Sequence, residues 1–133
     1  MDIQLVLDTF AKVFPEVHKL SLEVSREWYA DRPPGPHIVF NESIALPILD
    51  PMLEGSGTSD EMEAFFDCVE MVLRDADIDL ENLIKVEVLE RLLSNDSWLR
   101  RAEPYLGPLT ATLLQEFDLR RKWLARAPGV ADA

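Results

Sequence analysis

The stretch SDEMEAFFDCVEMVLRD, residues 59–75, decides the fold of this chain. Its apolar residues recur three or four positions apart, which is the spacing of side chains on one face of an α-helix. The members of this face are Phe65, Phe66, Val69, Val72 and Leu73. Because the acidic residues fall mostly off the face, the stretch predicts an amphipathic helix that buries one side and exposes the other.

The helical period continues in both directions along the chain. It predicts helices over residues 2–14, 15–28 and 109–124, and a short helix around residues 96–99. A further helix, over residues 79–94, is apolar over a wide arc. Helices of that kind are surrounded by others, so we expect it near the centre of the molecule.

The segment between the second helix and residue 59 fits the helical pattern less well. Its proline-rich start, residues 31–37, predicts a stiff linker. Residues 37–40 are apolar but too few to found a sheet, and they predict an extended segment. A helix up to about residue 53 follows, in which Pro47 suits the first turn and Pro51 breaks or kinks the helix.

Together these segments predict an all-α fold, a single-domain array of five to seven helices. The packing resembles that of an α-solenoid, although no sequence repeat of fixed period is visible. Alternating residues over 19–24 leave a strand open as the alternative there. Within the one domain of residues 1–133, we expect N-terminal helices over 1–30, the linker over 31–37, an acidic helical core over 38–124 and a frayed tail over 125–133.

The net charge of the protein is concentrated in one stretch. Residues 42–90 contain 14 acidic and two basic residues, and the resulting charge of −12 equals that of the whole chain. Such a one-sided field attracts a basic protein partner and accelerates its association. It disfavours nucleic acid and anionic membranes as direct partners, because both require basic patches. The basic residues at 100–101 and 120–122 are interpreted as solvated positions or as internal partners of the acids.

The acidic residues on the predicted helices of this stretch are therefore the candidate partner-binding residues. They are Asp60, Glu61, Glu63, Asp67, Glu70, Asp75, Asp77, Glu81 and Glu87. The alternative is a solvated face that only keeps the protein in solution. A surface of that kind usually mixes both signs of charge, whereas this stretch does not, and the asymmetry favours a docking role.

The sequence contains little that indicates catalysis or a bound cofactor. Asp75 and the alternating acids after it suggest a calcium loop, but Leu80 and Val86 occupy the positions that require glycine and glutamate. Asp79 is instead expected to cap the helix that follows. Cys68 is flanked by acidic and apolar residues, which predicts an unreactive buried thiol. We therefore expect no enzyme activity, no metal and no cofactor.

The cellular location follows from the same kind of reasoning. A single cysteine cannot form an internal disulfide bond, which is typical of a reducing compartment. The N-terminal residues do not form a signal peptide, and no apolar run is long enough to cross a bilayer. These observations predict a cytoplasmic protein.

Three stretches carry a resemblance to a known group of proteins. They are PHIVFNE at 36–42, FFDCVEM at 65–71 continuing through NLIKVEVLE at 82–90, and YLGPLT at 105–110. Over about residues 37–118 the chain is similar to small, acidic, all-helical bacterial proteins encoded beside polymorphic toxins, which act as immunity proteins. The resemblance implies an inhibitor that binds its cognate toxin domain and occludes a basic active-site cleft.

Two other functions remain open from the sequence. The first is a helical adaptor or scaffold that binds a basic partner without inhibiting it, and the second is a carboxylate-based hydrolase. For either binding function, an aromatic anchor inside the acidic field is expected to supply much of the affinity. The candidates for that anchor are Trp28, Tyr29, Trp98, Tyr105 and Trp123.

Overall fold

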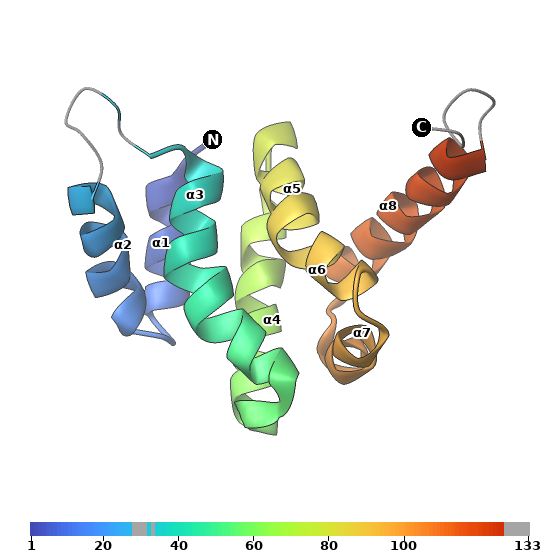
Figure 1. Ribbon diagram of the computed structural model, residues 1–133, viewed down its shortest axis with the longest axis horizontal. Helices are drawn as coiled ribbons and strands as arrows, with labels where there is room; N and C mark the ends of the chain where they lie inside the picture. The colour runs from blue at the N-terminus through green and yellow to red at the C-terminus, as the bar shows by residue number, and fades with distance from the viewer. Residues whose placement is uncertain (28–31, 33, 127–133) are drawn as a thin grey trace.

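The computed structural model describes residues 1–27, 32 and 34–126, and every regular element among them is helical. The predicted all-α fold is thus confirmed. The elements are α1 (Ile3–Ala11), α2 (Glu16–Glu27), α3 (Pro36–Phe40), η1 (Asn41–Leu49), η2 (Met52–Ser56), α4 (Ser59–Arg74), α5 (Ile78–Ile84), η3 (Lys85–Leu89), α6 (Glu90–Leu93), α7 (Asp96–Ala102), η4 (Glu103–Tyr105) and α8 (Pro108–Arg126). In Figure 1 they form an array with α2 at one end and α8 at the other.

Several of these elements join end to end. The helix that begins with α3 runs on through η1 and η2, and α5 continues through η3 into α6. The segments η1, η2 and η3 are π-helical, and η4 is a 3₁₀ turn at the end of α7. Counted in this way, the described residues make seven helices.

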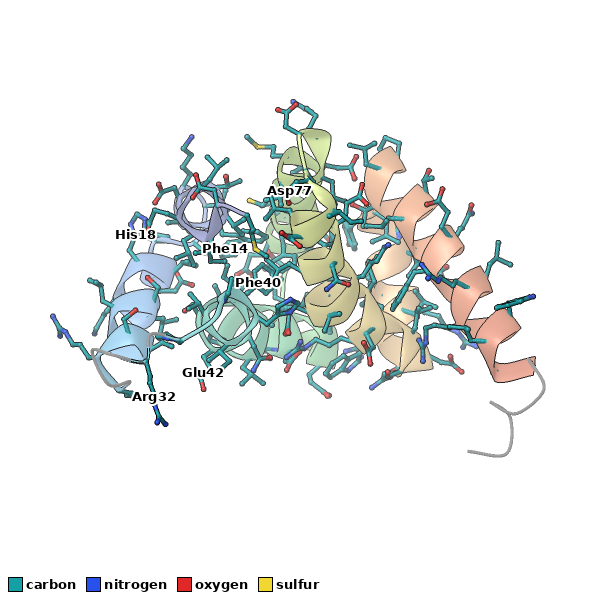
Figure 2. The ribbon with its side chains drawn as sticks, turned by 90° about the horizontal axis from the view of Figure 1, so that it is seen from above. Phe14, His18, Arg32, Phe40, Glu42 and Asp77 are labelled. Atoms are coloured by element: carbon teal, nitrogen blue, oxygen red, sulfur yellow. The ribbon has the colours of Figure 1, made fainter. Side chains whose placement is uncertain are left out.

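The core gathers around Phe65 on α4. Its ring centroid lies 5.1 Å from that of Phe10, 6.1 Å from that of Phe14 and 5.3 Å from that of Phe66. Phe10 also meets Phe40 edge to face at 5.7 Å, so the cluster joins α1, α3 and α4. Figure 2 shows Phe14 and Phe40 pointing between the helices. Burying one such ring stabilises the fold by about 1.5–3 kcal/mol.

The helix α4 forms where residues 59–75 predict it, and its start is well capped. The Thr58 hydroxyl accepts a hydrogen bond from the Glu61 backbone N–H at 3.1 Å, and the Glu61 carboxylate accepts one from the Thr58 N–H at 3.0 Å. This reciprocal pair is a capping box, which satisfies two backbone donors that a helix start otherwise leaves free. The predicted buried face is confirmed at Phe65 and Phe66 and their neighbours, although Leu73 is only half-buried.

The helix that begins with α3 passes through Pro47, as predicted, and also through Pro51, where a break or kink was predicted. Its backbone departs from helical geometry further on, at Gly55, whose φ is +114°. Pro47 lies inside η1 and Pro51 directly precedes η2. A proline ring collides with the carbonyl four residues earlier in an α-helix and cannot donate a hydrogen bond to it. In η1 the turns are wider, as the bond from the Asp50 N–H to the Ala45 carbonyl five residues back shows. The wider turn accommodates the ring, so the helix continues.

A polar network fastens this helix to η3 and α6. Arg91 donates to the Asp50 carboxylate at 3.0 Å, to the Glu87 carbonyl at 2.7 Å, and to the Asn41 side chain. The Glu87 carboxylate also lies 3.3 Å from the His37 ring. Because every member is partly buried and has a partner, the network specifies how the two helices pack.

The helix α8 is held by a residue from α4. The Glu70 carboxylate accepts hydrogen bonds from the backbone N–H groups of Leu109 at 3.0 Å and Thr110 at 2.8 Å, and from the Thr110 hydroxyl. A carboxylate is favoured at a helix N-terminus, where the backbone N–H groups are unpaired. A Cβ atom added to Gly107 would lie 2.2 Å from the Glu70 side chain, so this close approach requires glycine.

The second predicted helix is confirmed as α2, and the strand left open at residues 19–24 is excluded. Three other expectations from the sequence are wrong in detail. The expected extended segment at 37–40 is helical, and the linker expected over 31–37 ends before Pro36, because this proline starts α3. The N-cap of α5 is Asp77, whose carboxylate accepts from the Leu80 N–H at 2.8 Å, and not Asp79. Residues 125 and 126 of the expected tail belong to α8. The rest of that tail, linker residues 31 and 33, and residues 28–30 of the expected N-terminal helices lie outside the described residues.

Substitution of Glu70 tests the attachment of α8. We expect Glu70→Ala to lower the free energy of unfolding by about 1.5–3 kcal/mol, because hydrogen bonds to a charged group are lost and backbone donors are left unpaired. That loss corresponds to a decrease of roughly 5–10 °C in Tm, measured by circular dichroism. Gly107→Ala should also lower Tm, since its Cβ displaces the carboxylate. An unchanged Tm in both variants would contradict this role.

The same contact predicts an acid sensitivity. Burial raises the pKa of Glu70, but the hydrogen bonds from Thr110 and Leu109 outweigh it, so the pKa lies below the ordinary value of the group. A depressed pKa stabilises the fold above the unfolded pKa, and the stabilisation is lost as the pH falls through the folded pKa. Unfolding by urea between about pH 5 and pH 3 should therefore depend less on pH in Glu70→Gln than in the wild type.

Candidate partner-binding surface

Three of the predicted acidic residues form a stripe on the outer face of α4. Asp60, Glu63 and Asp67 are exposed and follow one another at intervals of three and four residues. At 100° per residue they point away from the buried face that contains Phe65 and Val69. Within the part of the chain that the structure describes, none of the three has a hydrogen bond or ion pair from its side chain. We call them the α4 acidic stripe.

Exposed apolar side chains accompany these charges. Met71 continues the line of the stripe by one turn, and 51% of its surface is exposed. Ile78, at the start of α5, is 81% exposed and lies in sequence between the exposed acids Asp77 and Asp79. An apolar side chain inside a charged rim is the usual anatomy of a protein interface. Neither residue was predicted from the sequence as part of the site. The helical spacing of apolar residues in α4 does, however, place Met71 off the buried face.

Four other predicted site residues already have partners within the chain. Glu61 closes the capping box, where hydrogen bonds from the Thr58 backbone and hydroxyl hold its pKa below the ordinary value. Glu70 caps α8, and Glu87 belongs to the Arg91 network. Asp77 caps α5 and lies 3.5 Å from the terminal amine of Met1. The Leu80 N–H is the main cause of its lowered pKa.

The two remaining predicted residues lie at different places. Asp75 is exposed where α4 ends, close in sequence to Met71. Glu81 is half-buried and faces α8, where it lines a cavity together with Glu116. The structure thus places Asp75 beside the α4 acidic stripe and separates Glu81 from it.

The aromatic candidates also divide by position. Trp28 and Tyr29 lie outside the described residues. Trp98 and Tyr105 are half-buried, and the Tyr105 hydroxyl lies 3.2 Å from that of Ser59. Trp123 is 68% exposed on the last turns of α8, far along the chain from the acidic residues.

The nucleophile and imidazole groups are engaged in the fold. Burial, with a smaller contribution from the charge of Asp67, raises the pKa of the Cys68 thiol to about 11. Its sulfur lies 3.7 Å from the Thr9 carbonyl. His18 pairs with Asp8 at 3.0 Å. Among the described residues there is no cluster of three side chains suited to a metal ion, and no helix combines the length and hydrophobicity of a membrane span.

The buried thiol makes a kinetic prediction. A pKa of about 11 leaves Cys68 protonated at neutral pH, and only the thiolate reacts with Ellman's reagent. We expect the reaction rate of the folded protein to keep rising beyond pH 9, whereas an ordinary thiol levels off near its pKa of about 8.5. Unfolding in urea should restore the ordinary profile. A plateau below pH 9 in the folded protein would show that the thiol is accessible and activated.

Comparison with known proteins places most of the chain in one family. A family model described as "Domain of unknown function (DUF7674)" matches residues 7–123. No curated protein and no solved structure matches the chain significantly. The matched residues include all of α4 and α5 and extend through nearly all of α8.

Proposed function

The chain belongs to the DUF7674 family, and we propose that it is an immunity protein, which binds and neutralises a cognate bacterial toxin domain through its acidic surface. The observation that carries the proposal is the α4 acidic stripe. Its three carboxylates are exposed, have no internal partner among the described residues and are flanked by the exposed Met71. Asp60 favours the start of α4 by its place in the first turn, but none of the three side chains forms a hydrogen bond or ion pair among the described residues, so their concentration on one face is explained best by a partner.

The charge of the surface indicates the chemistry of that partner. A toxin domain that cleaves nucleic acid needs a basic cleft to hold phosphate groups. Carboxylates spaced along a rigid helix can occupy the same cleft as phosphates do, and so exclude the substrate. In this arrangement the stripe supplies the electrostatic contacts, while Met71 and Ile78 supply apolar contact area that becomes buried on binding.

The electrostatic field of the acidic surface also accelerates binding. A neutralising protein must reach its target before damage occurs, and complementary charges raise association rate constants by orders of magnitude over those of neutral pairs. At 0.1 M salt the field is screened over about 10 Å, so association should slow as salt is added. A purely apolar interface would lack this dependence.

Charge reversal on the stripe tests the proposal. We expect Glu63→Lys with Asp67→Lys to weaken binding to the cognate toxin domain by at least about tenfold, mainly by slowing association. Because both side chains are exposed, the free energy of unfolding should change by less than about 0.5 kcal/mol per substitution. The measurements are surface plasmon resonance at two salt concentrations and growth rescue on co-expression with the toxin domain.

The matched control reverses two positive charges in place of the two negative charges. Arg120→Glu with Arg121→Glu changes two exposed residues of α8 and should leave both toxin binding and growth rescue unchanged. If instead this control abolishes rescue while the α4 reversals have no effect, the acidic stripe only maintains solubility. Binding by the wild type without growth rescue would favour the adaptor function over the immunity function.

A further inference from the structure

A groove runs between α5 and α8, and none of its lining residues belongs to the α4 acidic stripe. It consists of two adjoining cavities of about 170 and 480 Å³ that share Glu116 as a lining residue. Its apolar lining includes Leu113 and Phe117. Figure 1 shows α8 diverging from α5 and α6 towards its C-terminal end, and the larger cavity lies along this diverging part. We call this feature the α5–α8 groove.

The two ends of the groove differ in charge. The smaller cavity, near the start of α8, is lined by Glu81 and Glu116. The larger cavity is lined by Lys85, Arg120 and Arg121, against which Glu116 is the single acid. On a chain whose net charge is −12, this concentration of positive charge is the exception. The guanidinium of Arg121 lies 5.8 Å from the centre of the Phe117 ring, so part of the positive charge is held over the apolar floor.

The apolar side chains of α8 that line the larger cavity are only partly covered by the fold. Leu124 is 42% exposed and Phe117 is half-buried, and both line this cavity. Leu119 and Trp123 are also exposed on these turns, but they do not line the groove. Arginine, which contributes two of the lining residues, is among the residues that most often dominate the binding energy of interfaces.

We propose that the α5–α8 groove binds an acidic amphipathic helix of a second protein. Apolar side chains of that helix would cover Phe117 and Leu124, and its carboxylates would meet Lys85, Arg120 and Arg121. This mode is helix-in-groove recognition, in which one apolar stripe supplies affinity and the flanking charges supply orientation. The site is separate from the α4 acidic stripe and takes a partner of the opposite charge, so it does not depend on the immunity function.

A second copy of the chain fits the groove less well. The exposed apolar residues of α8 are the natural insert, but they lie among Arg120, Arg121 and Lys122. Insertion of one α8 into the groove of another molecule would therefore bring like charges together, which costs affinity.

Two designed peptides provide the test. Both are helices of about four turns with the same leucine stripe, and they differ only in whether glutamate or lysine flanks it. We expect the glutamate peptide to bind at 0.1 M salt, and to bind at least about tenfold more weakly to Arg120→Glu with Arg121→Glu. Arg120→Lys with Arg121→Lys keeps the charge and should retain most of the binding. Calorimetry measures the affinity for each variant.

The lysine peptide and the α4 variants separate this proposal from the proposed function. Glu63→Lys with Asp67→Lys should weaken binding of the lysine peptide and leave the affinity for the glutamate peptide unchanged. The proposal is overturned if the glutamate peptide does not bind, or if reversal of Arg120 and Arg121 leaves its affinity unchanged. It is also overturned if sedimentation shows a dimer that the same reversal dissociates, because the occupant is then a second copy. A chain ending at residue 126 that binds about tenfold tighter would identify residues 127–133 as the occupant.

Discussion

The packing of Phe65 is the constraint on which the rest of the structure depends. This ring touches Phe10, Phe14 and Phe66, so it fixes the distance between α1 and α4 and the rotation of α4 about its own axis. Once that rotation is fixed, residues half a turn away must face solvent. The acids at 60, 63 and 67 are therefore displayed because of where an aromatic ring is buried. Turning α4 enough to hide them would expose the centre of the core, which the local packing does not permit.

The acids of the chain serve two different purposes, and the structure separates them. Glu61, Glu70 and Asp77 accept hydrogen bonds from backbone N–H groups at helix starts, and Glu87 balances Arg91. Those of the α4 acidic stripe have no such task in the described residues. An acid that satisfies buried or terminal donors is fixed by the fold, whereas an acid that satisfies none is free to meet a partner. The high count of acids in residues 42–90 thus overstates the size of the docking surface.

Sequence reasoning recovered the long periodic helices and failed where local rules compete with burial. The spacing of apolar residues was sufficient for α4 and for the α5–α6 helix, since both bury an unbroken face. It failed at residues 37–40, which were expected to be extended but are helical, and at Pro51, where a break or kink was expected. Burial of Phe40, Ile44 and Leu53 accompanies a helix that continues past Pro51 and departs from helical geometry only at Gly55. Asp77 and Asp79 are two residues apart and either carboxylate can cap a helix. The spacing of residues could therefore not predict which of them caps α5. For the candidate site, the sequence predicted the sign of the surface charge. It could not predict the exposure of Ile78 and Trp123, because that exposure depends on tertiary packing.

The α4 acidic stripe and the α5–α8 groove have opposite charge preferences but share one structural support. Glu70 lies on α4, one turn after Asp67, and its carboxylate holds the first turn of α8. Any displacement of α4 is therefore transmitted to the helix that forms one wall of the groove. Loss of the Glu70 carboxylate would disturb both surfaces together and would not reveal which of them binds a partner. Glu63 and Arg120, which are exposed and have no part in this contact, separate the two surfaces, because each can be reversed in charge while the attachment of α8 stays intact.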